Sequence, residues 1–448
     1  KLTLNIGLRY EYYPLMSREK RGIEVLDLQN FNVLLGGVGS NSKNLGIKVS
    51  KTLFAPRLGA AYRLNDKTVF RAGYGQTFDP IPWSRPLRGF YPLTIGYQNS
   101  VTNNFDTFQL ASGIPTIPLP DLSTGVVRLP PNTTERWPDP TNVDRGRTQQ
   151  YNVTIERQLP AEISASVAYV GTRMDGGYAD HNLNYSEPGG GNAGRQYFAQ
   201  AGTADILKWG SFTKRRYNAL QVALNRPFKG GLLLKGAYTL SKARNETDDD
   251  GWVGLSWNQP SQLNRNFALA GYDRTHNFQM GFLYDIPLGK GSTNPVALVV
   301  RDWQLNGVFA AYSGTPFTIG GDNTLLNQRG GTQTIDLIAP LQRVGNPGPN
   351  DVYYSPASFA QPGNKWGNTG RNQFRGPGIW NLDMGLFRGF PIGHYRVEFR
   401  ATASNVLNHS RWGNPITGFT DPNFMKIRTT ESGGNIPRKI QLGARFQF

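Results

Sequence analysis

The sequence contains no cysteine, which excludes disulfide-stapled scaffolds, thiolate metal sites and cysteine nucleophiles. It also lacks any run of 18 apolar residues, which excludes a transmembrane helix; the longest apolar stretch is the short segment Val296–Val300. Acidic residues are few, with 31 Asp and Glu against 48 Lys and Arg, a formal charge of +17. No basic stripe interleaved with aromatic residues belongs to a known nucleic-acid-binding fold, so nucleic acid is not expected as a partner.

Catalytic motifs are also absent from the sequence. The four histidines are dispersed, and no H-E-x-x-H, G-x-S-x-G or Walker A pattern occurs. His394 begins a strand beside Tyr395, and we interpret it as a rim residue rather than a member of a hydrolytic triad. The run Asp248–Asp250 offers oxygen ligands for Ca²⁺, but its spacing does not follow the D-x-[DN]-x-[DN]-G loop, which favours a solvated loop. We therefore predict no enzymatic activity, no cofactor and no metal site.

Glycine and proline are frequent, at 53 and 30 of the 448 residues, which is too many for a helical protein and too few for low-complexity disorder. The start of the chain shows none of the features of a signal peptide. Lys1 instead leads directly into an alternating strand, so we expect either a mature chain or a fragment whose start is missing.

Apolar residues recur at every second position in long segments, which is the period of a strand with one apolar and one wet face. The first segment shows the pattern at Leu2, Leu4, Ile6, Leu8, Tyr10 and Tyr12, and the last shows it at Ile440, Leu442, Ala444, Phe446 and Phe448. Twelve such strands are predicted, at 2–13, 54–64, 68–78, 148–159, 162–172, 214–226, 232–242, 276–286, 298–313, 379–390, 394–406 and 437–448. Most exceed the usual ~5–6 residues of soluble strands and match the roughly 9–11 residues of a tilted strand that crosses a bilayer.

The connections alternate strictly between short and long. Short turns lie at 64–67, 160–161, 227–231, 287–297 and 391–393, and long segments lie at 14–53, 79–147, 173–213, 243–275, 314–378 and 407–436. This order is typical of outer-membrane barrels, in which periplasmic turns are short and extracellular loops are long. The sequence therefore predicts an all-β, antiparallel transmembrane β-barrel with about 12 strands present, and an extracellular crown built from the long loops.

Several strand segments resemble the C-terminal barrel region of Oar-like TonB-dependent transporters. The similar segments are FAPRLGAAYRLNDKTVFRAGYGQTFDP (54–80), QQYNVTIERQLPAEISASVAYVGTR (149–173), YNALQVALNRPFKGGLLLKGAYTLSKARNETDDD (217–250), RDWQLNGVFAAYSGTPFTI (301–319) and VEFRATASNVLNHSRWGNP (397–415). The final KIQLGARFQF (439–448) resembles the closing strand of the family. The resemblance covers nearly the whole chain.

The resemblance implies a 22-stranded barrel filled by an N-terminal plug that follows a TonB box. Residues 1–448 contain neither plug nor TonB box, so we expect them to be a single, partial barrel region that corresponds to the second half of such a barrel. The resemblance also implies that the terminal aromatic residues Phe446 and Phe448 are the signal read by the barrel-assembly machinery.

Charged residues that alternate with the apolar ones are expected to face the barrel lumen. They include Arg9, Glu11, Arg57, Arg63, Arg71, Arg396, Glu398, Arg400 and Arg445. One interpretation is a positively biased lumen that attracts an anionic solute by focusing the field in a polar cleft. The interpretation that we favour is that these charges pair with one another across strands and with a plug domain.

Aromatic residues in the predicted loops lie beyond the membrane, where no interfacial belt is needed. They are Trp83, Phe90, Tyr91, Tyr97, Trp137, Trp252, Trp257 and Trp366. Such rings could stack on a sugar, a peptide or a siderophore, and we consider them candidate substrate-binding residues. The alternative is that they pack a small core within the crown itself.

These patterns together predict TonB-dependent import of a scarce solute, of the siderophore, oligosaccharide or peptide class, across the outer membrane of a Gram-negative bacterium. The expected partners are outer-membrane lipid and lipopolysaccharide, the TonB complex acting through a plug, and the barrel-assembly machinery. Two alternatives remain open at this point: a complete 12-stranded passive channel, and a surface adhesin or assembly protein.

Overall fold

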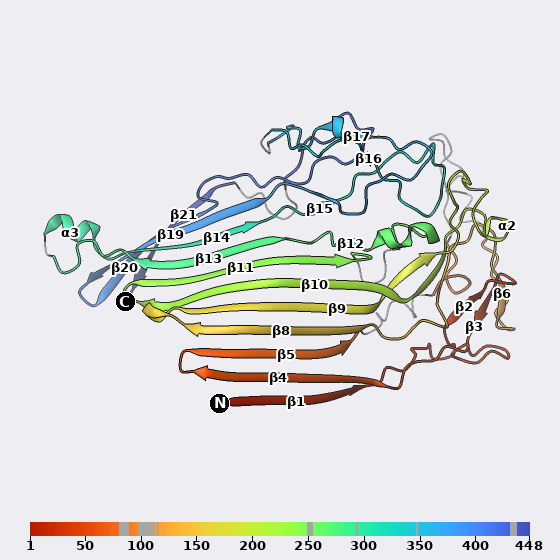
Figure 1. Ribbon diagram of the computed structural model, residues 1–448, viewed down its shortest axis with the longest axis horizontal. Helices are drawn as coiled ribbons and strands as arrows, with labels where there is room; N and C mark the ends of the chain where they lie inside the picture. Colours follow the sequence, from red (N-terminus) through yellow and green to blue (C-terminus); the bar gives the residue numbers. More distant parts are fainter. Residues whose placement is uncertain are drawn as a thin grey trace.

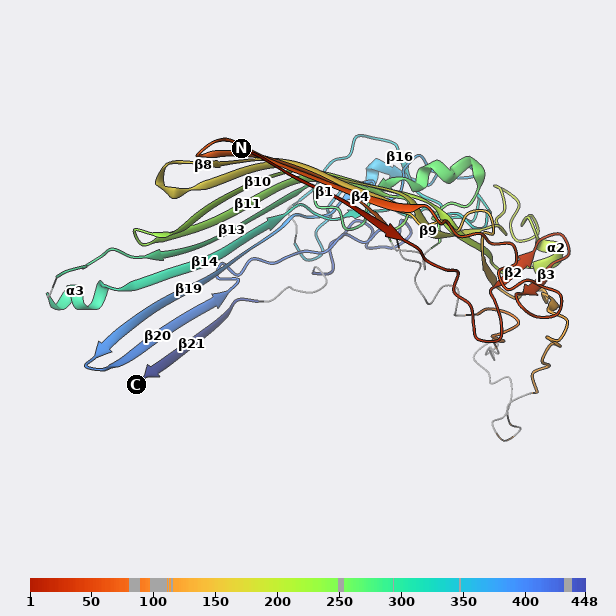
Figure 2. The same ribbon diagram turned by 90° about the horizontal axis from the view of Figure 1, so that it is seen from below.

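A single antiparallel sheet runs through the molecule and organises the rest of it (Figure 1). The computed structural model describes residues 1–79, 89–96, 111, 113, 116–248, 254–292, 294–345, 348–430 and 437–448. Twelve long strands pair in chain order: β1 (Leu2–Glu11), β4 (Leu53–Asn65), β5 (Thr68–Phe78), β8 (Arg147–Gln158), β9 (Ser164–Asn182), β10 (Ile206–Lys229), β11 (Leu232–Asn245), β13 (His276–Asp285), β14 (Trp303–Tyr312), β19 (Ile379–Ile392), β20 (Tyr395–Ser404) and β21 (Lys439–Gln447). The sheet is curved into a shell with both chain termini at the end that carries the short turns (Figures 1 and 2).

All twelve predicted strands are present, and the short and long connections alternate as the sequence indicates. The prediction for 298–313 was wrong at its start, because Pro295–Val300 form the short helix α3 and β14 begins only at Trp303. Pro295 occupies the first helical turn, where its missing N–H is no loss, and the Asn294 side chain accepts a hydrogen bond from the Val296 amide at 2.9 Å. No described helix is long and apolar enough to cross a membrane.

Strands β9 and β10 extend well beyond the predicted segments 162–172 and 214–226. Their pairing continues to the bridge between Asn182 and Leu207, so the two strands project past the rest of the sheet. At the opposite end they are joined to their other neighbours by tight turns. In the turn between β10 and β11, Gly230 and Gly231 have φ values of 58° and 80°, a left-handed conformation that glycine adopts at little cost.

The register aligns apolar residues opposite apolar residues across neighbouring strands. Ile6 lies opposite Leu58, and Leu58 lies opposite Tyr74. The same face continues through the later strands, where it carries Val153, Tyr169, Leu220, Leu240, Phe282, Leu305, Leu386, Ala401 and Leu442. A one-residue slip in any pair would turn its apolar set to the other face.

This apolar face is open to the surroundings rather than packed against protein. Ile6 is 80% exposed and Leu442 is 77% exposed, and no second sheet or helical layer among the described elements covers the face. In a water-soluble protein an apolar surface of this extent is rare. The arrangement therefore indicates that hydrocarbon surrounds the sheet, and that the opposite, polar face is turned away from lipid.

The long connections fold into a separate layer at the far end of the strands, which we call the crown (Figure 1). It contains a three-stranded sheet of β2 (Glu24–Asp27), β3 (Asn32–Leu35) and β6 (Val126–Arg128), and β7 (Glu135–Pro138), which adds to β10 in parallel. Its remaining elements are short: α2 (Phe198–Ala201), η3 (Pro260–Asn266), β12 (Ala268–Leu269), β15 (Pro316–Phe317), β16 (Asp336–Leu337), η4 (Pro356–Ser358), β17 (Phe359–Ala360) and β18 (Phe374–Arg375). The helical turn η2 (Pro160–Glu162) lies instead in the tight turn between β8 and β9.

The apolar face of the sheet yields a direct test of its environment. We expect Val222→Lys, on the apolar face of β10 and one pleat step deeper in the membrane than the level of Tyr169, to destabilise the membrane-inserted protein by about 2–4 kcal/mol, because a lysine towards the bilayer centre is costly. Its sequence neighbour Gln221 points to the opposite face, so Gln221→Lys is the matched control and should have little effect. Reversible unfolding in lipid vesicles measures both. Equal effects of the two substitutions would contradict the assignment of faces.

Candidate functional site

The crown is a folded body with two apolar cores, and it is the candidate site because it covers the end of the sheet. The larger core is buried where β2, β3, β6 and β7 meet the projecting ends of β9 and β10. Its members include Phe31, Val33, Leu35, Leu129, Trp137, Tyr178, Ile206 and Trp209. The Tyr178 and Trp209 rings lie edge to face, with centroids 6.0 Å apart. The extension of β9 and β10 beyond the membrane therefore serves as the support on which this part of the crown folds.

The second core lies between β14 and β21 in the sequence and is rich in aromatic residues. It contains Phe317, Ile319, Ile335, Phe359, Phe374, Phe424 and Met425. The Phe359 ring contacts both Phe374 and Phe424 edge to face, at centroid distances of 5.5 and 5.7 Å. The Phe359–Phe424 pair brings the 314–378 connection and the 407–430 segment together.

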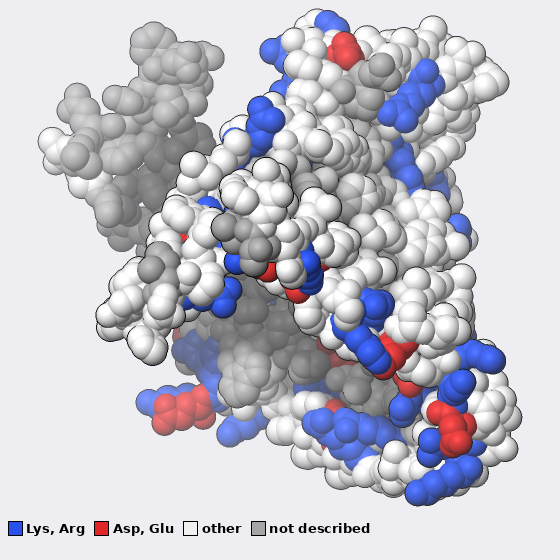
Figure 3. Space-filling model, turned by 90° about the vertical axis from the view of Figure 1, so that its left-hand side faces the viewer, with Lys and Arg blue, Asp and Glu red and all other residues white. Residues whose placement is uncertain are grey.

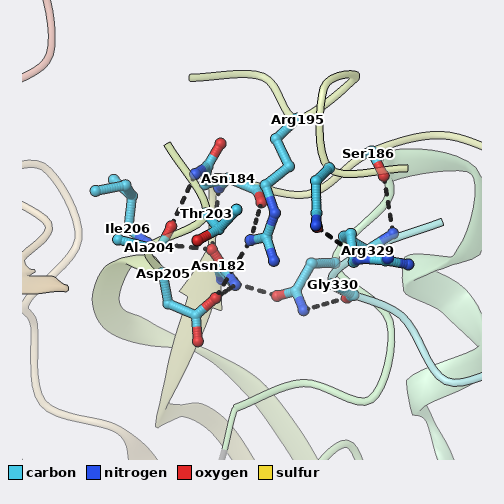
Figure 4. A network of polar contacts seen from close by, with 12 residues as sticks. Asn182, Asn184, Ser186, Arg195, Thr203, Ala204, Asp205, Ile206, Arg329 and Gly330 are labelled. Atoms are coloured by element: carbon cyan, nitrogen blue, oxygen red, sulfur yellow. Dashed lines mark hydrogen bonds and ion pairs between the residues drawn. The ribbon is translucent and has the colours of Figure 1, made fainter. Parts of the chain in front are cut away.

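A buried polar junction links three of the long connections (Figure 4). The Asn184 side chain is fully buried; it donates to the carbonyl oxygens of Ala204, at 2.7 Å, and Gly202, at 3.1 Å. The same side chain accepts from the Tyr197 amide at 2.9 Å. Asn184 thus holds together two parts of the connection between β9 and β10 that are distant in sequence.

Two further buried amides join this segment to the other connections. Gln259 donates from its side chain to the carbonyl oxygens of Ser186 and Arg329, at 3.0 and 2.8 Å. Asn258 donates to the Gly330 carbonyl at 2.6 Å and accepts from the Asn182 amide at 2.8 Å. Since the bonds cross from 182–186 to 258–259 and on to 329–330, the three segments are held as one unit.

A charged junction ties the crown to the top of β11. Arg371 is largely buried; it donates to the Asn245 carbonyl and lies 3.0 Å from the Asp248 carboxylate. Asp248 also accepts from the Gly271 amide at 2.7 Å and from Asn245 at 3.0 Å. Asp248 is therefore engaged by protein groups, and Asp249 and Asp250 lie outside the described residues. Among the described residues no group of three or more His, Asp or Glu side chains could hold a metal ion.

The predicted loop aromatics divide into buried and partly exposed residues. Trp137 is 2% exposed and belongs to the larger core, and Trp257 is fully buried, with its indole N–H donating to the Thr332 carbonyl at 2.8 Å. These two rings present no face to solvent. Phe90, Tyr91 and Trp366 are partly exposed. The other predicted aromatics, Trp83, Tyr97 and Trp252, lie outside the described residues.

The predicted lumen charges lie on the polar face of the sheet, opposite the apolar one. Their pairing runs along strands as well as across them. Arg9 bonds to Glu11 at 2.9 Å and Arg400 to Glu398 within single strands, whereas Arg71 reaches from β5 to Glu156 on β8 at 3.0 Å. Arg63 pairs with Asp66 in the short turn at 3.2 Å. Arg57, Arg396 and Arg445 are exposed. Seen from the short-turn end, basic side chains outnumber acidic ones around a hollow (Figure 3).

The closing strand places its aromatic residues at the short-turn end of the sheet. Phe446 is 56% exposed and Phe448 is 97% exposed, with ring centroids 6.2 Å apart. Tyr395 stacks on Phe446 from the neighbouring strand at 5.4 Å.

A buried carboxyl group lies within the crown at Glu135, which sequence reasoning did not single out. Its side chain is fully buried on β7. Burial raises the pKa of Glu135 well above its ordinary value; the Arg136 backbone amide offsets part of this rise, and the nearby Glu24 carboxyl adds to it. Burial also raises the pKa of Glu24, although Arg18 counteracts it. The folded crown therefore favours protonated Glu135.

The buried polar junction predicts that the side-chain amide of Asn184 is important for the stability of the crown. We expect Asn184→Ala to destabilise the 182–206 segment, because buried groups left unsatisfied cost about 1–3 kcal/mol each. Gln200→Ala, at an exposed position of α2, is the matched control and should be neutral. Hydrogen exchange of the backbone amides of 182–206 measures both. Unchanged exchange in Asn184→Ala would contradict a structural role for the junction.

The buried Glu135 carboxyl predicts that the stability of the folded crown depends on pH. Because the pKa of Glu135 is higher in the folded than in the unfolded crown, folded stability falls as pH rises from the ordinary glutamate value through the raised one. We expect Glu135→Gln to raise the unfolding temperature of the crown at neutral pH and to flatten its pH profile. Glu187→Gln, an exposed crown position, should change neither. Thermal unfolding followed from pH 4 to 8 checks this, and an unchanged profile in Glu135→Gln would disprove it.

Comparison with known proteins agrees with the architecture. Residues 1–441 match the family described as the outer membrane beta barrel domain. No curated protein matches the chain.

Three solved structures are similar to the chain at low identity. The ferric citrate transporter FecA in its unliganded form shares 10% identity, with 88% of this chain and 38% of that chain covered and a TM-score of 0.40. The ferric preacinetobactin receptor BauA from Acinetobacter baumannii shares 11%, with 100% and 40% covered and a TM-score of 0.41. The pyoverdine receptor FpvA from Pseudomonas aeruginosa PAO1 shares 12%, with 93% and 38% covered and a TM-score of 0.43. The chain spans about two fifths of the length of these proteins.

The family match, the single antiparallel sheet and its uncovered apolar face lead to one conclusion. The chain belongs to the outer membrane beta-barrel domain family and resides in the outer membrane of a Gram-negative bacterium.

Proposed function

We propose that the protein imports a scarce solute across the outer membrane in a TonB-dependent manner, and that this chain supplies the barrel wall and the extracellular binding layer. The observation that carries the proposal is the folded crown. Its two apolar cores and its buried polar junctions hold long connections in one arrangement. A preorganised layer of this kind loses little conformational entropy when it captures a dilute solute.

The TonB dependence is supported by the strand segments that resemble Oar-like TonB-dependent transporters. Five segments and the closing strand occur in the order expected for that family. In such a transporter a plug blocks the lumen until energy supplied through TonB moves it. This chain performs no bond chemistry in the proposal.

The proposed solute belongs to the siderophore, oligosaccharide or peptide class. Among the predicted loop aromatics that the structure describes, Phe90, Tyr91 and Trp366 are those whose partial exposure leaves ring surface for stacking. The guanidinium of Arg136 lies 5.1 Å from the centre of the Phe90 ring, which adds a cation beside one of these surfaces.

The wall is proposed to be one part of a larger barrel rather than a closed 12-stranded one. In the sheet order β1 and β21 stand at opposite ends, and each pairs with one neighbour among the described strands. Unpaired backbone groups in hydrocarbon cost several kcal/mol each, so both edges require partner strands. Exposed charges on the polar face, including Arg57 and Arg396, would then contact a plug or the passing solute.

Assembly of this wall is proposed to begin at its closing strand. Phe446 and Phe448 lie exposed at the end of the sheet, where the barrel-assembly machinery could read them.

Energised uptake is the decisive test of the proposed function. In cells that express the full-length protein, we expect uptake of labelled ferric siderophores, oligosaccharides or peptides to require both TonB and the proton-motive force. Solute flux into vesicles without an energy source would instead establish a passive channel. Cell adhesion without energised uptake of any of the three classes would establish the adhesin.

The crown aromatics yield a second test on the same cells. We expect the double substitution Phe90→Ala and Trp366→Ala to weaken solute binding by about tenfold, because two stacking contacts of ~0.5–1.5 kcal/mol each are lost. Phe198→Ala removes a crown ring that is 40% exposed but lies outside the predicted set, and it should leave binding unchanged. Binding isotherms on whole cells compare the three proteins.

A further inference from the structure

The apolar face of the sheet ends abruptly in basic residues on one group of strands. On β11 this face carries Leu232, Leu234, Gly236, Tyr238 and Leu240, and the next two residues on the same side are Lys242 and Arg244. Both are exposed. The wall therefore changes from apolar to cationic within one step of the pleat, at the crown end of the membrane-facing surface.

The same change occurs at the same level on the neighbouring strands. Register places Arg173 opposite Arg216 and Arg216 opposite Arg244, all on the apolar side of the sheet. The outward basic patch formed in this way consists of Arg147, Arg173, Lys214, Arg216, Lys242 and Arg244. All except the half-buried Arg216 are exposed.

The patch holds more positive charge than the acidic groups beside it can balance. Asp175 lies 2.9 Å from Arg173 and 2.5 Å from Arg216, so one carboxylate serves two guanidinium groups. Glu246 accepts a hydrogen bond from the Lys214 backbone amide at 2.7 Å. Six cations thus face Asp175 and Glu246, with Asp144 in the adjoining cleft, and adjacent like charges on paired strands repel each other.

The patch begins at β8 and does not extend to the strands that precede β8 in the sheet. At the corresponding level the apolar side of β1 and β4 carries Tyr10 and Phe54, whose ring centroids are 5.2 Å apart. A general need for solubility above the membrane would not leave the apolar side of β1, β4 and β5 without a cation at this level.

Depth along the strands places the patch at the lipid headgroups. Arg173 lies four residues beyond Tyr169, or roughly 13 Å at ~3.3 Å per residue. Tyr169 and Tyr151 face the same side with ring centroids 6.1 Å apart, as expected for the aromatic belt of a membrane interface. Lys242 is level with Tyr151, and Arg173, Arg216 and Arg244 lie one pleat step beyond it, where side chains meet headgroups rather than acyl chains.

A cleft lies beside the patch and forms a concave surface there. It has a volume of about 510 Å³, and Arg145, Arg147, Gln149, Arg173 and Asp175 are among its lining residues. Guanidinium groups bind phosphate oxygens in bidentate fashion, and the amide and carboxylate can hydrogen-bond sugar hydroxyls.

We propose that the outward basic patch on β8–β11 binds the phosphorylated sugar headgroup of an outer-leaflet glycolipid, lipopolysaccharide, whose acyl chains lie on the apolar face directly below. The continuity of the patch with that apolar face selects an amphiphile over a free anion, because a soluble phosphate would gain nothing from the adjoining lipid surface. The proposal does not depend on solute import.

The test uses the full-length protein purified from outer membranes. Its glycolipid content is measured as bound 3-hydroxy fatty acid, and its thermal stability is measured with added bisphosphorylated lipid A, dephosphorylated lipid A or inorganic phosphate. For the triple substitution Arg147→Gln, Lys242→Gln and Arg244→Gln we expect at least about a tenfold loss of glycolipid affinity, since each basic group near a charged lipid surface contributes to binding. Heat-modifiable migration in gels verifies that the variant is folded.

The matched control removes three exposed basic residues from the short-turn end, with Lys67→Gln, Arg157→Gln and Lys290→Gln, and should retain the wild-type glycolipid content. On the unsubstituted protein, stabilisation by bisphosphorylated but not by dephosphorylated lipid A supports the proposal. Equal stabilisation by inorganic phosphate would overturn the lipid assignment. Equal glycolipid content in the two triple variants would overturn the site.

Discussion

Hydrocarbon imposes the constraint on which the rest of this structure depends. A backbone amide or carbonyl in a bilayer has no water to bond with, so each strand must pair along its length. The side chains that face the lipid must be apolar, and the period of the strand then sends the alternate residues to the opposite, polar face. The continuous row from Ile6 through Leu58 and Tyr74 to Leu442 follows from this constraint, and so does its exposure.

Beyond the membrane the protein is surrounded by water, so the crown buries its apolar side chains, as a soluble protein does. Its two apolar cores bury aromatic rings away from water, and its buried amides, such as Asn184 and Gln259, satisfy backbone groups that no strand partner reaches. Strands β9 and β10 connect the membrane region with the crown. Their lower halves face lipid, and their extensions carry Tyr178 and Trp209 in the larger core of the crown. The outward basic patch lies at the transition between them.

The strands of this protein were predictable because lipid enforces a simple local rule. A strict period of two over 9–14 residues survives in the sequence wherever one face must be apolar, as at Leu2–Glu11 and His276–Asp285. Where the alternation is absent, the prediction lost accuracy: residues 298–300 were predicted to start a strand but belong to the helix α3, since an apolar run without alternation fits a helix equally well. For Trp137 and Trp257 the sequence left open whether the rings bind a solute or pack a core within the crown, because their burial depends on segments distant in sequence.

The sequence by itself determined the strand number, the alternation of short and long connections, and the side of each strand that meets lipid, because each of these is written in the spacing of neighbouring residues. Only the tertiary structure decided which side chains meet in space. It buried Glu135 beside Glu24, joined 182–186 to 258–259 and 329–330, and placed Arg173, Arg216 and Arg244 in one row. The physical reason is that register and long-range packing depend on pairings between segments tens to hundreds of residues apart. A local sequence pattern does not specify such pairings.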